Sequence, residues 1–305
     1  MTRRGWLLFI AMCVIWGIPY LLIRVAVREL TPATLVFGRC AVAVLLLVPV
    51  AALGGQLRPL VARWKPLLAY TLVEIAVPWV LLSSAEVHLS SSLTAILIGT
   101  VPLVSAVALR ATGDDERLSR RRLAGLLLGF IGVGALVGLD VSGASPGALL
   151  ELALVVVCYA IGPIILARYL VDLPALGVVA ASLALTAVGY APVAALQFPS
   201  AVPSAGALGA VVALGVICSG VAFLVFVALV REVGPGRATV ITYVNPAVAA
   251  LLGVSLLGET LTVGMGVGFV FVLAGSILAT RRVAPRDGSA SSRRAPVAAP
   301  AIGEP

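Results

Sequence analysis

Long apolar runs, separated by short polar segments, constrain this chain more than any other feature. Of its 305 residues, 61% are hydrophobic and only 11% are charged, whereas soluble domains carry about 25% charged residues. A helix needs about 20 apolar residues to cross a bilayer. We therefore predict ten membrane-spanning helices, over Trp6–Ile23, Ala33–Leu53, Pro66–Ser84, Leu89–Leu109, Leu123–Leu139, Gly147–Ala167, Leu173–Leu196, Gly206–Val230, Ala238–Leu257 and Val263–Thr280.

These ten runs contain only three charged residues, Arg39, Glu74 and Glu151. The first run follows two arginines, as in a signal peptide, but no small-residue cleavage site follows it, so we expect a retained helix. The sequence predicts an all-α polytopic membrane protein.

Prolines and glycines recur inside the runs at a nearly constant spacing. Both residues are costly within a helix, so this recurrence indicates repeated geometry. The chain is predicted to contain two copies of one five-helix unit, over residues 1–139 and 147–280, followed by a disordered tail over 283–305. The matching pairs are Pro19/Pro163 and Pro102/Pro246, 144 residues apart, and Pro49/Pro192, Glu116/Glu259, Gly125/Gly268 and Gly132/Gly275, 143 apart.

An odd number of helices per copy makes the second copy enter the membrane from the opposite face. The two copies are then inverted repeats, an arrangement that recurs in transporters that work by alternating access. With the N-terminus inside, all of the 21 basic residues except Arg24, Arg28 and Arg39 fall on the inner side. This asymmetry predicts a cell-membrane protein with both termini in the cytoplasm, and it explains the net charge of +8 without a nucleic-acid partner.

Two segments resemble a known family. The sequence YVNPAVAALLGVSLLGETLTVGMGVGFVFV, within Ala238–Val272, and its first-copy partner, Leu93–Leu136, are similar to the EamA-type repeat of the drug/metabolite transporter superfamily. Trp16-Gly17 also fits that family's opening helix. The resemblance implies ten helices, a central cavity, and export or exchange of small metabolites. The first copy departs from it, with Asp114-Asp115-Glu116 where the second has Leu257-Gly258-Glu259, so we expect a solvated cytoplasmic turn there.

Glu74 lies near the middle of the third run. A charge at mid-bilayer costs about 3 kcal/mol or more unless it faces a cavity or is neutralised. Glu74 is therefore a candidate for proton coupling or cation recognition, and the alternative is a protonated or hydrogen-bonded packing carboxyl. Tyr70 and Pro78 lie one turn away on either side, and the proline would free a backbone carbonyl near Glu74.

The other two charges lie towards the outer side. Arg39 could extend outward to the interface, pair with an acid, or bind an anionic group of a substrate, and the first two readings are favoured. Glu151 has a similar position, and the sequence does not show whether the two residues meet.

Aromatic residues form a second set of candidates for the substrate cavity. Trp16 and Tyr20 share one helix face, which suits stacking on flat or cationic substrates, and packing against neighbouring helices is the alternative. Trp79 and Tyr159 are weaker candidates of the same kind; Tyr159 lies at the repeat position of Trp16.

The ninth run carries a polar stripe of Thr239, Thr242 and Asn245. An amide in lipid needs partners, so Asn245 either joins helices or lines the cavity together with Thr242. Pro102 and Pro246 are expected to break their helices at equivalent positions, because each removes one backbone hydrogen bond.

Other prominent residues are expected to be structural. Glu259 should cap the N-terminus of the helix that follows it, and Gly125–Gly129 and Gly264–Gly268 should allow close helix packing. The four cysteines and the single histidine form no metal-binding pattern, so we expect no metal and no cofactor.

The leading functional prediction is a secondary transporter that exports small metabolites or drugs, driven by protons through Glu74. The alternatives are an ion-independent exchanger or lipid-intermediate flippase of the same fold, and a non-transporting membrane sensor or structural protein. No nucleotide-binding motif is present, and an intramembrane enzyme lacks its paired catalytic groups, so we expect no enzymatic activity. Besides the lipid bilayer, the expected partners are a small-molecule substrate and protons; the sequence leaves the oligomeric state open.

Overall fold

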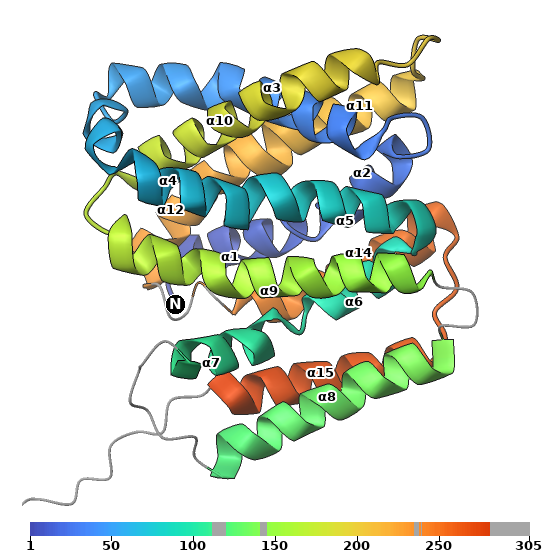
Figure 1. The fold of residues 1–305 in the computed structure, drawn as a ribbon. Coiled ribbons are helices and arrows are strands. Elements are labelled where there is room, and N and C mark those ends of the chain that lie inside the picture. The colour runs from blue at the N-terminus through green and yellow to red at the C-terminus, as the bar shows by residue number, and fades with distance from the viewer. Residues whose placement is uncertain (112–119, 141–144, 235–237, 239, 281–305) are drawn as a thin grey trace, which may run out of the picture.

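A computed structural model shows a helical bundle (Figure 1). It describes residues 1–111, 120–140, 145–234, 238 and 240–280. The charged turn at 114–116, most of the boundary between the two repeats, and the tail over 283–305 lie outside these residues. The helical elements are α1 (Arg3–Ile15), α2 (Ile18–Ala26), α3 (Pro32–Leu53), η1 (Arg58–Arg63), α4 (Trp64–Tyr70), η2 (Thr71–Ala76), α5 (Val77–His88), α6 (Ser91–Ile98), α7 (Val101–Ala111), α8 (Arg120–Asp140), α9 (Pro146–Tyr169), α10 (Ala175–Leu196), α11 (Ala205–Ala213), η3 (Leu214–Val221), α12 (Ala222–Val233), α14 (Ile241–Leu257) and α15 (Val263–Thr280).

These elements account for the ten predicted spans and confirm the fold class. Seven continuous helical stretches are long and apolar enough to cross a membrane, and three shorter apolar helices complete the set. Many large apolar side chains point outward, such as Leu45, Leu53 and Leu196, at 75%, 91% and 88% exposure. In a membrane protein this surface faces lipid.

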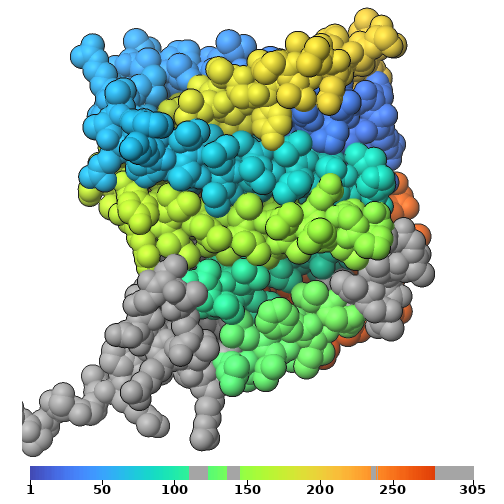
Figure 2. All heavy atoms as spheres, in the orientation of Figure 1, coloured from blue at the N-terminus to red at the C-terminus, as the bar shows by residue number. Residues whose placement is uncertain are grey.

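The helices of the two halves interleave rather than forming two separate blocks. α3 packs along α10 at one edge of the bundle, and α8 packs along α15 at the opposite edge (Figure 1). Between these edges the segment Arg58–His88 lies beside α9, and Figure 2 shows this blue segment of the first half between the yellow and lime helices of the second. Any site in the middle of the bundle is therefore built from both halves.

Two helices of the first half are broken ahead of a proline. α1 ends at Ile15 and α6 ends at Ile98, and each end is four residues before a proline, Pro19 or Pro102. Because proline has no N–H, the carbonyl four residues earlier loses its helical partner. The break expected at Pro102 therefore lies just ahead of it, at Gly99 and Thr100.

The corresponding prolines of the second half do not break their helices. Pro163 lies inside the continuous α9, and Pro246 lies inside the continuous α14. The expectation of a helix break at Pro246 is thus wrong. One missing N–H removes one backbone hydrogen bond and does not by itself end a helix. α9 continues through Pro163 although Gly162 stands directly before it.

Two wide helical turns recur at the same spacing as the prolines. η2 begins at Thr71 and η3 begins at Leu214, 143 residues later, and both are π-helical. η2 is followed by Pro78, which has no backbone N–H to donate to the preceding turn. π-helical turns are rare and are often found at functional sites, so this pair directs attention to the centre of the bundle.

Candidate functional site

The two π-helical turns each receive a polar side chain from the opposite half. The Arg39 guanidinium of α3 donates to the Ser219 hydroxyl of η3 at 3.3 Å, and the Thr71 hydroxyl of η2 donates to the Ser182 hydroxyl of α10 at 2.9 Å. Arg39 and Ser182 are 143 residues apart, so they occupy equivalent positions of the two repeats. The polar centre therefore has the approximate symmetry of the repeat, but the first half supplies a charged residue, Arg39, where the second half supplies the neutral Ser182.

Arg39 is buried in this centre and does not extend to the surface. Its side chain is 4% exposed, and its guanidinium lies over the Trp79 ring, with Cζ 3.7 Å from the ring centroid. A cation on an aromatic face is worth about 2 kcal/mol when desolvated. The outward-extending reading of Arg39 is wrong, and Trp79 serves as a platform for the guanidinium.

Glu74 lies in η2 and points towards a glycine of the second half. An ideal Cβ at Gly162 of α9 would lie 2.9 Å from the carboxyl carbon of Glu74 and 3.1 Å from its Cβ. The carboxyl thus fills space that only a glycine leaves open. Its Oε2 atom is buried without a hydrogen-bond partner, which is costly unless the group is neutral or has a ligand.

Tyr159 of α9 connects the two charged residues of the site. Its side chain lies beside Trp79 and within electrostatic range of both Glu74 and Arg39. Tyr20 of α2 lies within range of Tyr159. Together with Arg39, Glu74 and Trp79, these tyrosines form what we call the central cluster: Tyr20, Arg39, Glu74, Trp79 and Tyr159.

Trp16 and Asn245 lie outside this cluster and join helices. Trp16, at the end of α1, packs against Phe226 and Phe223 of the eighth span, with ring centroids 5.0 and 6.2 Å apart. The Asn245 amide is placed to donate to the carbonyls of Cys13, at 3.3 Å, and Ile241, at 2.9 Å. Asn245 thus connects α14 to α1, which favours the helix-joining reading of this residue.

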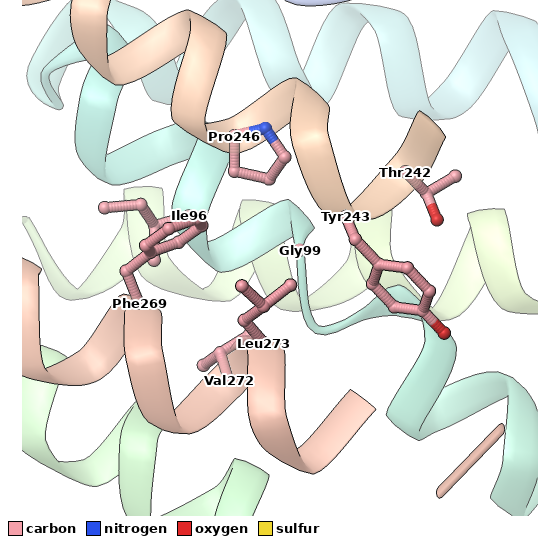
Figure 3. Close-up of a pocket in the computed structure, with 8 residues that line it drawn as sticks. All are labelled: Ile96, Gly99, Thr242, Tyr243, Pro246, Phe269, Val272 and Leu273. Carbon is pink, nitrogen blue, oxygen red and sulfur yellow. The ribbon is translucent and has the colours of Figure 1, made fainter. Parts of the chain in front are cut away.

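A small cavity lies beside Pro246, between the α6–α7 break, α14 and α15 (Figure 3). Thr242, Tyr243 and Pro246 face Gly99 and Ile96 across it, and Phe269, Val272 and Leu273 of α15 close it. Its volume of about 10 Å³ holds about one water molecule. In this conformation the Thr242 side of α14 therefore offers no room for a substrate.

Glu259 forms a structural cap, but on a different helix from the predicted one. Its two carboxylate oxygens accept from the backbone N–H groups of Ser91 and Ser92, at 2.8 and 3.0 Å, and from both hydroxyls, at 2.9 and 2.5 Å. The capped helix is α6, in the first half, and not α15. Burial raises the pKa of Glu259, but these donors outweigh it and bring the pKa below its usual 4.5.

A second carboxylate makes the reverse connection at the same end of the bundle. Glu29, in the α2–α3 loop, accepts from the Ser204 backbone N–H at 2.6 Å and from its hydroxyl at 2.5 Å, and Ser204 is the N-cap of α11. The Ser204 bonds lower the pKa of Glu29. We call this the distal end, because it lies opposite the N-terminus. Each half caps a helix of the other half there.

Polar contacts also join the halves at the N-terminal end. The Thr2 hydroxyl donates to Glu232 of α12 at 2.5 Å, and Arg63 donates to the Tyr169 carbonyl at 3.0 Å. Hydrogen bonds between the halves are thus present at both ends of the bundle.

Sequence reasoning missed one carboxyl, Glu86, because the third span was expected to end at Ser84. α5 continues to His88, and Glu86 is fully buried. Ser84 donates to Glu151 of α9 at 2.9 Å, so Glu151 pairs with α5 and Arg39 pairs with Trp79 and Ser219. The signal for Glu86 was its position one helical turn beyond Leu82, on the same face of the helix.

A polytopic helical bundle with a polar centre built from two repeated halves is the architecture of a membrane transporter. The comparisons agree: the model of the EamA-like transporter family matches residues 3–138 and again residues 146–281. The chain belongs to this family, and the resemblance read from the sequence is confirmed.

Two relatives carry names of the same kind. The chain is 32% identical over 262 residues to YedA of Escherichia coli K12, named as an uncharacterized inner membrane transporter, covering 83% of this chain and 82% of the relative. It is 25% identical over 297 residues to a transporter of Archaeoglobus fulgidus, covering 92% and 99%. A crystal structure with a TM-score of 0.64 and 21% identity covers 92% of this chain and 97% of the other and shows the same fold.

Proposed function

We propose that this transporter is a proton-coupled exporter of small metabolites or drugs that works by alternating access, with Glu74 as the coupling carboxyl. The observation that carries the proposal is the position of Glu74. Its carboxyl is inserted from the π-helical turn of one half against Gly162 of the other, with one buried oxygen free of partners. A group in this position changes its surroundings whenever the two halves move relative to each other.

The central cluster supports the binding of a solute. Tyr20, Trp79 and Tyr159 present aromatic surface, and Arg39 and Glu74 present opposite charges within electrostatic range of one tyrosine. Flat rings and a cation suit substrates that are themselves aromatic or charged. The bonds at the two ends of the bundle support alternating access, since releasing either set opens one side only.

The distribution of basic residues supports an orientation with the N-terminal end in the cytoplasm. Export then runs from the end that carries Thr2 and Glu232 to the end that carries Glu29 and Glu259. Impermeant labelling of both termini in intact cells tests this orientation. Two termini on opposite sides would remove the antiparallel relation of the halves.

A ligand screen tests the proposed binding site. Any solute that binds the folded protein raises its melting temperature with its affinity and concentration. We expect a panel of metabolites and drugs to contain compounds that stabilise the purified protein, and we expect Tyr159→Ala to lose that stabilisation. The matched control is Tyr169→Ala, at the exposed end of the same helix, which should keep it. Equal stabilisation of both variants would place the solute elsewhere.

A further inference from the structure

Glu86 differs from every other carboxyl in the described part of the chain. It lies two residues before the end of α5 and is 0% exposed, and neither carboxyl oxygen has a hydrogen-bond partner. A buried ionised carboxylate without partners costs several kcal/mol. The function proposed above uses Glu74 and gives Glu86 no role.

Charged groups surround Glu86, but none of them bonds to its side chain. From α2, Arg24 donates to the backbone carbonyls of Glu86 and Val87, the latter at 2.9 Å. From α3, Arg39 is occupied by Trp79 and Ser219. Tyr20 of α2 and Glu259, in the loop before α15, lie within electrostatic range of Glu86. His88 follows it by two residues on α5, and Glu151 of α9 accepts from Ser84, two residues before it.

The position of Glu86 connects it to opening of the distal end. Glu86 is followed within a few residues by Leu89, which is 2% exposed, and by the α6 N-terminus that Glu259 caps. The junction of α5 and α6 is thus held on one side by Arg24 of α2 and on the other side by Glu259 of the second half. Opening the distal end must release this junction, and water would then reach Glu86.

We infer that Glu86 is a proton-binding site of the distal gate, protonated while the gate is closed and exchanging its proton with the distal solution when the gate opens. On opening, the O–H bond of the acid breaks and the proton passes to water, which leaves a hydrated carboxylate. On closing, the carboxylate takes a proton back. The inference rests on the alternating opening proposed above.

The test measures how accessible the junction is. The rate at which a membrane-impermeant reagent modifies the thiol of Leu89→Cys is measured in proteoliposomes. This rate is divided by the rate for Val202→Cys, whose position at the same end of the bundle is 90% exposed. The ratio removes the pH dependence of the reagent and of an exposed thiol, and the remaining pH dependence of a buried thiol at position 89 is measured in the Glu86→Gln chain. The chain without an added cysteine gives the background of the four native thiols.

We expect the normalised rate to rise severalfold between about pH 6 and about pH 9, as deprotonation of Glu86 favours the open gate. Glu86→Gln, which mimics the neutral acid, should hold the low rate at every pH, and Glu151→Gln should keep the rise. If Glu86→Gln does not fold, Glu86→Met replaces it as a neutral variant of similar size.

Three results overturn the inference and are distinguishable. A rise in rate that persists in the neutral Glu86 variants, or that is lost equally in Glu151→Gln, removes the role of Glu86 and leaves alternating access standing. A rate that stays at background at every pH, even without substitution of Glu86, shows that the distal end does not open, and the proposed function fails with it. Dependence on sodium at constant pH would assign the site to that cation instead.

Discussion

The contact between Glu74 and Gly162 can be tested by a substitution that adds one carbon atom. In Gly162→Ala the new Cβ would lie 2.9 Å from the carboxyl carbon and 3.1 Å from the Cβ of Glu74, whereas carbon atoms pack best at about 3.5–4.0 Å. The carboxyl must turn away. Such overpacking costs about 1–3 kcal/mol, offset by about 1 kcal/mol that alanine gains over glycine in a helix.

The matched control is Gly189→Ala, in α10, because an added Cβ there has no atom within 4 Å. This variant should be neutral or more stable by up to about 1 kcal/mol. The free energy of unfolding, measured by titration with denaturing detergent in micelles, should thus differ between the two variants by about 1–3 kcal/mol.

A double-mutant cycle isolates the contact itself. Glu74→Ala removes the carboxyl and leaves only the 3.1 Å contact with the Cβ at position 74. Gly162→Ala should therefore cost less in that background, with a coupling energy of about 1–3 kcal/mol. If Gly162→Ala behaves like Gly189→Ala, or if the coupling is zero, Glu74 does not point between the halves and the reasoning about the site fails.

Two further substitutions test the surroundings of the site. Glu259→Gln should lower the free energy of unfolding by about 1 kcal/mol, a modest value because the group is half exposed. The pKa of Glu259 is lowered in the folded protein, so its contribution to stability is full above about pH 4.5 and is lost as the pH falls through the lowered pKa. The variant should lack this pH dependence. An unchanged acid profile in the variant would contradict the cap on Ser91 and Ser92. Arg39→Lys should cost about 1–2 kcal/mol, because an ammonium does not stack on Trp79 as a guanidinium does; wild-type stability by thermal unfolding would show that the stacking contributes little.

The fold was predictable from the sequence because the lipid bilayer sets both the length and the low charge of a membrane-spanning helix. Each run long enough to cross the bilayer is helical, and the recurrent prolines led to the repeat that the family match shows. The error at Pro246 arose because one missing N–H removes only one backbone hydrogen bond. Its loss coincides with the end of α6 ahead of Pro102 but is tolerated within α14.

The site was predicted only in part, because it depends on contacts between halves. Glu74, Trp79 and Tyr159 were candidates from their own positions. The stacking of Arg39 on Trp79, its bond to Ser219 and the burial of Glu86 depend on residues far apart in the chain, and no local pattern indicates such contacts.

Glu74 is proposed to couple the movement of solute to the movement of protons. The measurement is accumulation of a stabilising compound from the ligand screen in proteoliposomes, with and without an imposed pH gradient. We predict that the gradient drives accumulation by the natural protein, and that Glu74→Gln still equilibrates the compound but no longer accumulates it. Accumulation that still follows the pH gradient in Glu74→Gln would contradict the account.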